Sequence, residues 1–206
     1  MIAPPCARHA LIIASVAWPS STLPLRLTLE DAYDPFGLRA CATQLMEEAN
    51  VVDAADDAIA NICGLHEREL VPHVPALYMR DMPRSERMGE IIKISFSLDR
   101  LECAARGPML AGGAKVTRAD ATIFPNMVLL KLTLPVHFGW TEWTDEAIFW
   151  RRPRLHAWYE LMKYEKAAKA VEAAITSKLE EEIVDWGELA LDVPTSHLRT
   201  FPKHAL

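Results

Sequence analysis

The sequence is poor in the residue patterns that mark metal centres, disulfide frameworks and activated nucleophiles. It contains no Gly-rich phosphate loop, no H-E-x-x-H and no nucleophile-elbow motif, and its seven histidines show no metal-ligand spacing. The four cysteines form no C-x-x-C pair and stand far apart, at Cys6, Cys41, Cys63 and Cys103. We therefore predict no catalytic residue, no metal site and no intrinsic cofactor, and we expect reduced thiols in an intracellular setting.

Long apolar runs and excess positive charge are also missing. No apolar run reaches the length that spans a bilayer, so no transmembrane segment is expected. The net charge of -6 argues against a nucleic-acid or anionic-membrane surface, because counterion release does not favour an acidic protein there. Half of the 206 residues are hydrophobic, which is enough for a sizeable core in one domain or two small ones.

Residues 1–29 contain no acidic residue, and their four prolines interrupt any long helix. Three interpretations stay open for this stretch: an organelle-targeting or secretory segment, a β-strand that covers the domain, or a poorly ordered lead that could be an artefact of gene annotation. We expect an irregular lead over residues 1–37, with breakers at 30–37. A cytoplasmic location is favoured, and organelle targeting by residues 1–29 stays open.

From residue 38 onward, the spacing of apolar residues predicts helices. The first helix runs over 38–63 with Gly64 as its stop. The proline-rich stretch 67–84 follows, and its middle, residues 77–81, is expected as a helical turn or a loop. Segment 85–106 is ambiguous, because its apolar residues alternate at 92–98 as in a strand, while its length and lack of internal proline favour a helix. We expect the helix.

Three further helices are predicted: one over 117–132, one that begins at Pro153, and one over 165–186. Residues 188–206 form a tail. In the helix over 117–132, Pro125 predicts a kink, and Pro135 predicts that the helix ends before it. This helix is apolar almost all round, as a buried central helix is.

The start of the central helix carries a capping pattern. Thr117 and Asp120 stand three apart just ahead of an apolar run, which is the spacing of a reciprocal N-cap. In such a cap the Thr117 hydroxyl accepts from the N–H of Asp120, and the Asp120 carboxylate accepts from the N–H of Thr117. Gly112 and Gly113 supply the sharp entry before it.

Two motifs follow each other between residues 109 and 170. Leu-Ala-Gly-Gly at 110–113 leads into Val-Thr-Arg-Ala-Asp-Ala at 116–121, and Pro-Arg-Leu-His-Ala-Trp-Tyr-Glu-Leu-Met follows at 153–162. This order resembles the helical C-terminal domain of cytosolic glutathione transferases, in which such a box opens the buried central helix and the second motif packs beside it. The resemblance is weaker over 38–106 and does not extend to residues 1–35.

The resemblance implies an all-α helical bundle over 38–187 and ligand contacts for Gln44 and Glu48, which fall on the helix that lines the family's cleft. It also implies glutathione as a substrate and an apolar co-substrate pocket in the helical half. The family's thiol-activating, thioredoxin-like half needs roughly 80 residues, a domain in itself, where this sequence has only residues 1–37. We therefore expect a glutathione-transferase-like protein without a complete glutathione site.

Two alternatives to this function stay open. One is a non-catalytic docking module, which forms a homodimer or binds a protein partner. The other is a ligandin-like carrier of apolar small molecules.

Overall fold

The computed structural model describes residues 34–51, 56–79, 82–137 and 147–182. Over these residues the fold contains six α-helices and no strand, which confirms the all-α prediction. The helices are α1 (Leu38–Glu48), α2 (Asp57–Leu65), α3 (Arg84–Ala104), α4 (Arg118–His137), α5 (Pro153–Met162) and α6 (Lys166–Glu182). Three short helical segments are the π-helix η4 (His66–Leu70) and the 3-10 helices η5 (Val71–Leu77) and η7 (Ala147–Phe149).

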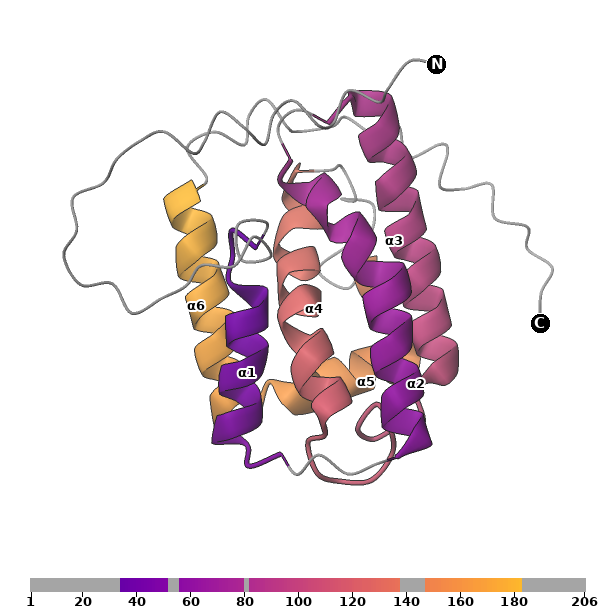
Figure 1. Cartoon of the computed structure of the whole chain (residues 1–206), viewed down its shortest axis with the longest axis vertical. Helices are drawn as coiled ribbons and strands as arrows, with labels where there is room; N and C mark the ends of the chain where they lie inside the picture. The colour runs from indigo at the N-terminus through magenta and orange to yellow at the C-terminus, as the bar shows by residue number, and fades with distance from the viewer. Residues whose placement is uncertain (1–33, 52–55, 80–81, 138–146, 183–206) are drawn as a thin grey trace, which may run out of the picture.

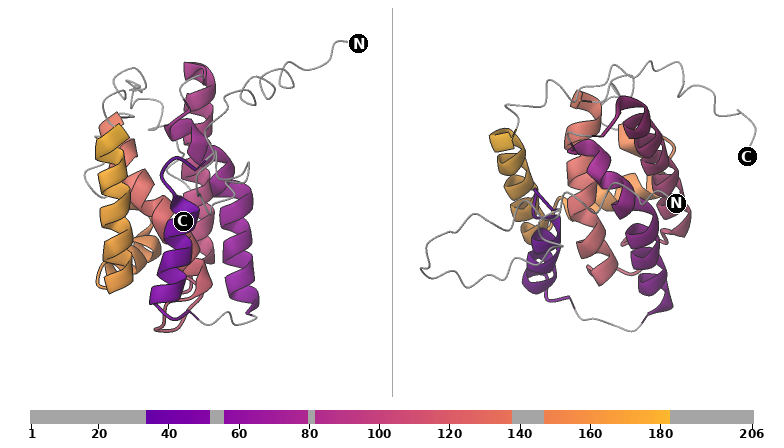
Figure 2. Two further views of the ribbon diagram at one scale, coloured as in Figure 1. Left: turned by 60° about the vertical axis from the view of Figure 1, so that its left-hand side comes forward. Right: turned by 45° about the horizontal axis from the view of Figure 1, so that its top comes forward.

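Helix α4 is the centre of the bundle. It contacts α1 and α6 on one side and α2 on the other, and α3 lies beyond α2 (Figure 1). The views in Figure 2 show the same order, with α5 crossing near one end of the longer helices. Every side chain from 123 to 130 is buried, as expected for a helix that is apolar all round.

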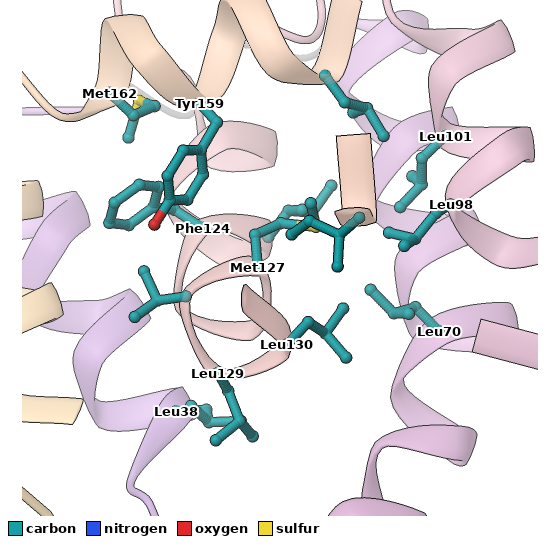
Figure 3. Packing of buried hydrophobic residues seen from close by; sticks show 14 of the residues in the cluster. Leu38, Leu70, Leu98, Leu101, Phe124, Met127, Leu129, Leu130, Tyr159 and Met162 are labelled. Atoms are coloured by element: carbon teal, nitrogen blue, oxygen red, sulfur yellow. The ribbon is translucent and has the colours of Figure 1, made fainter. Parts of the chain in front are cut away.

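The core is built from apolar side chains that reach α4 from both sides. Leu129 lies near Leu38 of α1, while Leu130 points toward Leu70 on the opposite side (Figure 3). Phe124 stacks on Tyr159 of α5 with ring centroids 5.4 Å apart. Such an aromatic pair adds about 0.5–1.5 kcal/mol to the burial of its area.

The predicted single helix over 38–63 is wrong. The chain leaves α1 after Glu48, Asn50 adopts a left-handed backbone with φ 50°, and α2 begins at Asp57. The Asp56 carboxylate accepts from the N–H of Ala58 at 2.7 Å, so α2 has its own N-cap. A left-handed residue and a capping aspartate override apolar spacing that continues across the break.

Gly64 does not stop the helix as predicted. Leu65 and His66 keep right-handed helical angles, and the chain continues as η4 and η5 through the proline-rich stretch. The π-helical geometry of η4 gives way to 3-10 geometry in η5, where Pro72 and Pro75 have no N–H to donate. Of residues 77–81, expected as a helical turn or a loop, Leu77 ends η5, Tyr78 is in a turn, and 80–81 lie outside the described residues.

Other predicted boundaries hold in part. Segment 85–106 is helical, because α3 spans Arg84–Ala104, and α5 begins at Pro153. Pro135 does not end α4, which reaches His137; the buried Thr133 and Leu134 hold this turn in the core despite the missing hydrogen bond. The lead before residue 34, the residues after 182 and Gly187 lie outside the described residues.

The two ends of the described chain meet. Helix α1 packs against α6, and the Lys178 ammonium of α6 donates to the carbonyl of Phe36 at 3.1 Å. Phe36 is buried in the turn that precedes α1. The bundle is thus closed by a contact between its first turn and its last described helix.

Candidate functional site

A mostly apolar groove of about 660 Å³ opens between α1, the consecutive helical segments η4 and η5 (the η4–η5 turn), and the first half of α4. We call it the α1–α4 groove. Ligand pockets for small molecules usually measure about 300–1,000 Å³ and combine apolar walls with a few polar groups. The groove matches this description. Its lining residues are Asp34, Leu38, Arg39, Ala42, His66, Glu67, Val71, Pro72, Val74, Pro75, Tyr78, Thr122 and Asn126.

Asp34 fixes the first wall of the groove. Its carboxylate accepts from the N–H groups of Leu38 at 2.8 Å and Arg39 at 2.9 Å, which belong to the first turn of α1, where a helix offers no carbonyl partner of its own. Gly37, with φ 64°, makes the left-handed turn that lets the chain enter the helix. Ala42 then lies one turn into α1 and leaves room in the wall because its side chain is a single methyl group.

Arg87 of α3 holds the second wall. This buried guanidinium donates to the carbonyls of Ala76 and Met79, and to that of Met82 at 3.3 Å. These three carbonyls belong to the end of η5 and the chain that follows it. The arginine therefore ties η5, which carries Val74, to α3.

Two polar residues of the groove lining are hydrogen-bond partners although they stand sixty positions apart in the sequence. Asn126 of α4 and His66 of η4 both line it, and the Asn126 Nδ2 lies 3.0 Å from the His66 Nε2. A carboxamide nitrogen can only donate, so Nε2 must accept. His66 is therefore in the tautomer that carries its proton on Nδ1. The Nδ1 atom is buried and has no hydrogen-bond partner among the described residues.

Burial also sets the charge of this histidine. It lowers the pKa of His66 from 6.5 to about 4, because an imidazolium in this environment would lose its hydration. The ring is neutral at physiological pH. It offers one buried N–H donor and no positive charge.

Two groups that could supply an activated nucleophile are protonated here. Burial, and then the neighbouring Asp34 carboxylate, raise the pKa of Tyr78 to about 12. Burial is also the main cause that raises the pKa of the Cys41 thiol, which lies on α1 beside Ala42 and is not part of the groove lining. The groove thus provides hydrogen-bonding and apolar contacts rather than a thiolate or phenolate.

The residues expected to contact a ligand do not line the groove. Gln44 and Glu48 are exposed on α1, where the Gln44 Nε2 donates to the Glu48 Oε1 at 2.7 Å. The α1 residues that do line it are Leu38, Arg39 and Ala42, all nearer the start of the helix.

Thr117 and Asp120 lie at the start of α4, where the fully buried Asp120 carboxylate accepts from the Thr117 N–H at 2.7 Å. It accepts also from the Leu110 N–H at 2.8 Å. The Thr117 hydroxyl donates to the same carboxylate at 2.6 Å, whereas the sequence pattern led us to expect it as an acceptor. The pair fixes the entry to the helix that carries Asn126.

Sequence reasoning missed His66 and Asn126. A C-x-x-H at 63–66 is the only local pattern at the histidine, and it says nothing about a partner sixty residues away. His156, by contrast, stacks on Phe149 with ring centroids 5.1 Å apart and belongs to the aromatic packing around α5.

Within the part of the chain that the structure describes, no group of three or more His, Cys, Asp or Glu side chains could hold a metal ion. No helix there is both long and apolar enough to cross a membrane. Comparison with protein-family models, curated proteins and solved structures yields no match.

Proposed function

We propose that this protein binds small, largely apolar molecules in the α1–α4 groove. It would act as a ligandin-like carrier, or as the co-substrate-binding half of a glutathione-transferase-like protein. The observation that carries the proposal is the groove itself, which measures about 660 Å³ and has a mainly apolar lining surface to which aliphatic and proline side chains contribute.

The chemistry of the lining supports binding over catalysis by these residues. Tyr78 keeps its proton, His66 is neutral and already bonded to Asn126, and the walls are held by Asp34 and Arg87. The resemblance of 109–170 to the helical glutathione-transferase domain agrees with an apolar binding role. In that family the helical half shapes the pocket for the apolar co-substrate.

A fluorescence titration with Nile red, a neutral dye that brightens in apolar surroundings, tests the proposal. Ala42→Leu places three additional carbon atoms in the groove wall, and Ala40→Leu adds the same atoms at an exposed position on the same helix. We expect wild type and Ala40→Leu to bind alike and Ala42→Leu to bind roughly tenfold more weakly, which corresponds to about 1.4 kcal/mol of lost contact.

Two further measurements complete the test. Thr122→Phe fills the groove from α4, where Thr122 is only half-buried, so it checks the result if Ala42→Leu lowers the unfolding temperature. A dye that fails to bind wild type, or that binds all variants equally, would refute the proposal. Retention on glutathione resin together with conjugation of an aromatic electrophile would show a complete glutathione site, contrary to expectation.

A further inference from the structure

We infer that the apolar stretch 10–18, in the chain that precedes the bundle, binds in the α1–α4 groove and competes there with small apolar molecules. The inference rests on the proposed function, because both assign the same groove to apolar groups. Three observations carry it: the apolar lining of the groove, the attachment of this part of the chain to a lining residue, and the charges on the two sides.

The chain enters the bundle at the groove itself. Asp34 is the first described residue, and it lines the groove while its carboxylate binds the first turn of α1. A linker of fifteen residues, 19–33, separates the apolar stretch from Asp34. Fully extended, this linker spans about 50 Å, so its length does not prevent the stretch from returning to the groove. A covalent connection of this kind gives the stretch an effective concentration of about 1 mM there.

The composition of the stretch matches the groove. Its sequence is Ala-Leu-Ile-Ile-Ala-Ser-Val-Ala-Trp, in which eight of nine residues are hydrophobic and none is charged. The groove lining includes leucine, alanine, valine and proline residues, and its volume of about 660 Å³ is that of a small-molecule pocket. Contact between the two removes apolar surface of both from water, which favours binding.

Charge favours this stretch over the chain that follows the bundle. The charged residues nearest to stretch 10–18 are Arg8 and Arg26, one on each side. After the bundle, the apolar residues 189–191 stand between Glu188 and Asp192. The groove lining carries two acidic side chains and one basic side chain, those of Asp34, Glu67 and Arg39. A stretch flanked by arginines is attracted to such a lining, whereas one flanked by acids is repelled.

Nile red titration of the full chain tests the competition. The stretch variant, Ile12→Asp with Ile13→Asp, places two charges within the apolar stretch. The linker variant, Ser21→Asp with Thr22→Asp, places the same two charges outside it and is the control. Neither pair lies in the described bundle, so both variants keep its contacts unchanged.

The expected effect follows from the effective concentration. A segment present at about 1 mM that binds with a dissociation constant of about 0.1–0.5 mM weakens dye binding about 3- to 10-fold. We expect the stretch variant to bind Nile red more tightly than wild type by this factor, and the linker variant to bind it as wild type does. Ala42→Leu, added to the stretch variant, should weaken the dye again because Ala42 lines the groove.

A nitroxide on Cys6 measures the contact without the dye. Cys103→Ser leaves Cys6 as the reactive thiol, because Cys103 is exposed and the other two cysteines are buried. Thr122 of α4 lines the groove and reports on its occupant. We expect the nitroxide to broaden the amide resonance of Thr122 in wild type and in the linker variant, and to broaden it less in the stretch variant.

The outcomes separate the two proposals. If Nile red binds wild type and both variants alike, or if the Thr122 broadening is the same in all three, only the docking of the stretch is overturned. If the dye binds none of them, the proposed function fails, and the nitroxide alone decides whether the stretch docks. Broadening of isotope-enriched protein by separate nitroxide-labelled molecules would place the stretch of a second copy in the groove, and would overturn the intramolecular contact.

Discussion

Removal of the Asp120 carboxylate should destabilise the bundle more than the loss of an ordinary helix cap. This carboxylate is fully buried and accepts three hydrogen bonds, from the N–H groups of Leu110 and Thr117 and from the Thr117 hydroxyl. In Asp120→Ala the two N–H donors have no acceptor, while the hydroxyl can rotate toward water.

The magnitude follows from the burial of the two donors. An unsatisfied buried donor costs about 1–3 kcal/mol, and the one at Leu110 is buried whereas the one at Thr117 is half-buried. We expect Asp120→Ala to lower the free energy of unfolding by about 3–4 kcal/mol. Asp120→Asn should recover less than half of this loss, because its amide offers one oxygen and sets an NH₂ group against the other donor.

Urea denaturation followed by far-UV circular dichroism measures the effect, with Asp56→Ala as the matched control. Asp56 caps α2 through one bond, to the N–H of Ala58 at 2.7 Å, so its loss should cost about 1 kcal/mol. If Asp120→Ala costs no more than Asp56→Ala, the three-bond account of the α4 entry is wrong.

Two other perturbations test contacts elsewhere. Because burial depresses the folded-state pKa of His66 from 6.5 to about 4, the free energy of unfolding should be undiminished by this residue above pH 6.5 and fall by roughly 3 kcal/mol as the pH drops to about 4. His66→Phe should flatten that pH dependence of the urea midpoint, and equal slopes in the two proteins would contradict the assignment. Glu102 of α3 caps α5 by accepting from the N–H groups of Arg154 at 3.1 Å and Leu155 at 2.9 Å, so Glu102→Ala should cost about 1–2 kcal/mol. Glu86→Ala, at an exposed site on the same helix, should stay within about 0.5 kcal/mol in the same thermal unfolding assay, and a similar loss in both would argue against the cap.

The all-α class and the buried central helix could be predicted because both depend on local periodicity. Apolar residues recur all round α4, and no competing pattern interrupts them between 119 and 134. The break after Glu48 could not be predicted, because the apolar spacing runs on through it, while the chain turns at Asn50. The prediction that Pro135 ends α4 was wrong for a related reason. Tertiary burial of the last turn outweighs the one backbone hydrogen bond that proline cannot make.

The groove was less accessible from the sequence than the fold. Its position depends on the packing of α1, the η4–η5 turn and α4, which no local pattern encodes. Gln44 and Glu48 were chosen for the correct helix, but its groove face ends at Ala42, a residue with no chemistry to draw attention to it. The pairing of His66 with Asn126 becomes visible only when two helical segments are brought together.

The bond from Lys178 to the Phe36 carbonyl has a consequence for synthesis. More than a hundred residues separate α1 from α6, and α1 lies against that helix in the finished bundle. At about 5–20 residues per second, the ribosome needs roughly 6–24 s to make the intervening chain. During that interval the side of α1 that later packs against α6 is uncovered. The emerging polypeptide therefore exposes apolar surface that chaperones can recognise until α6 has been made.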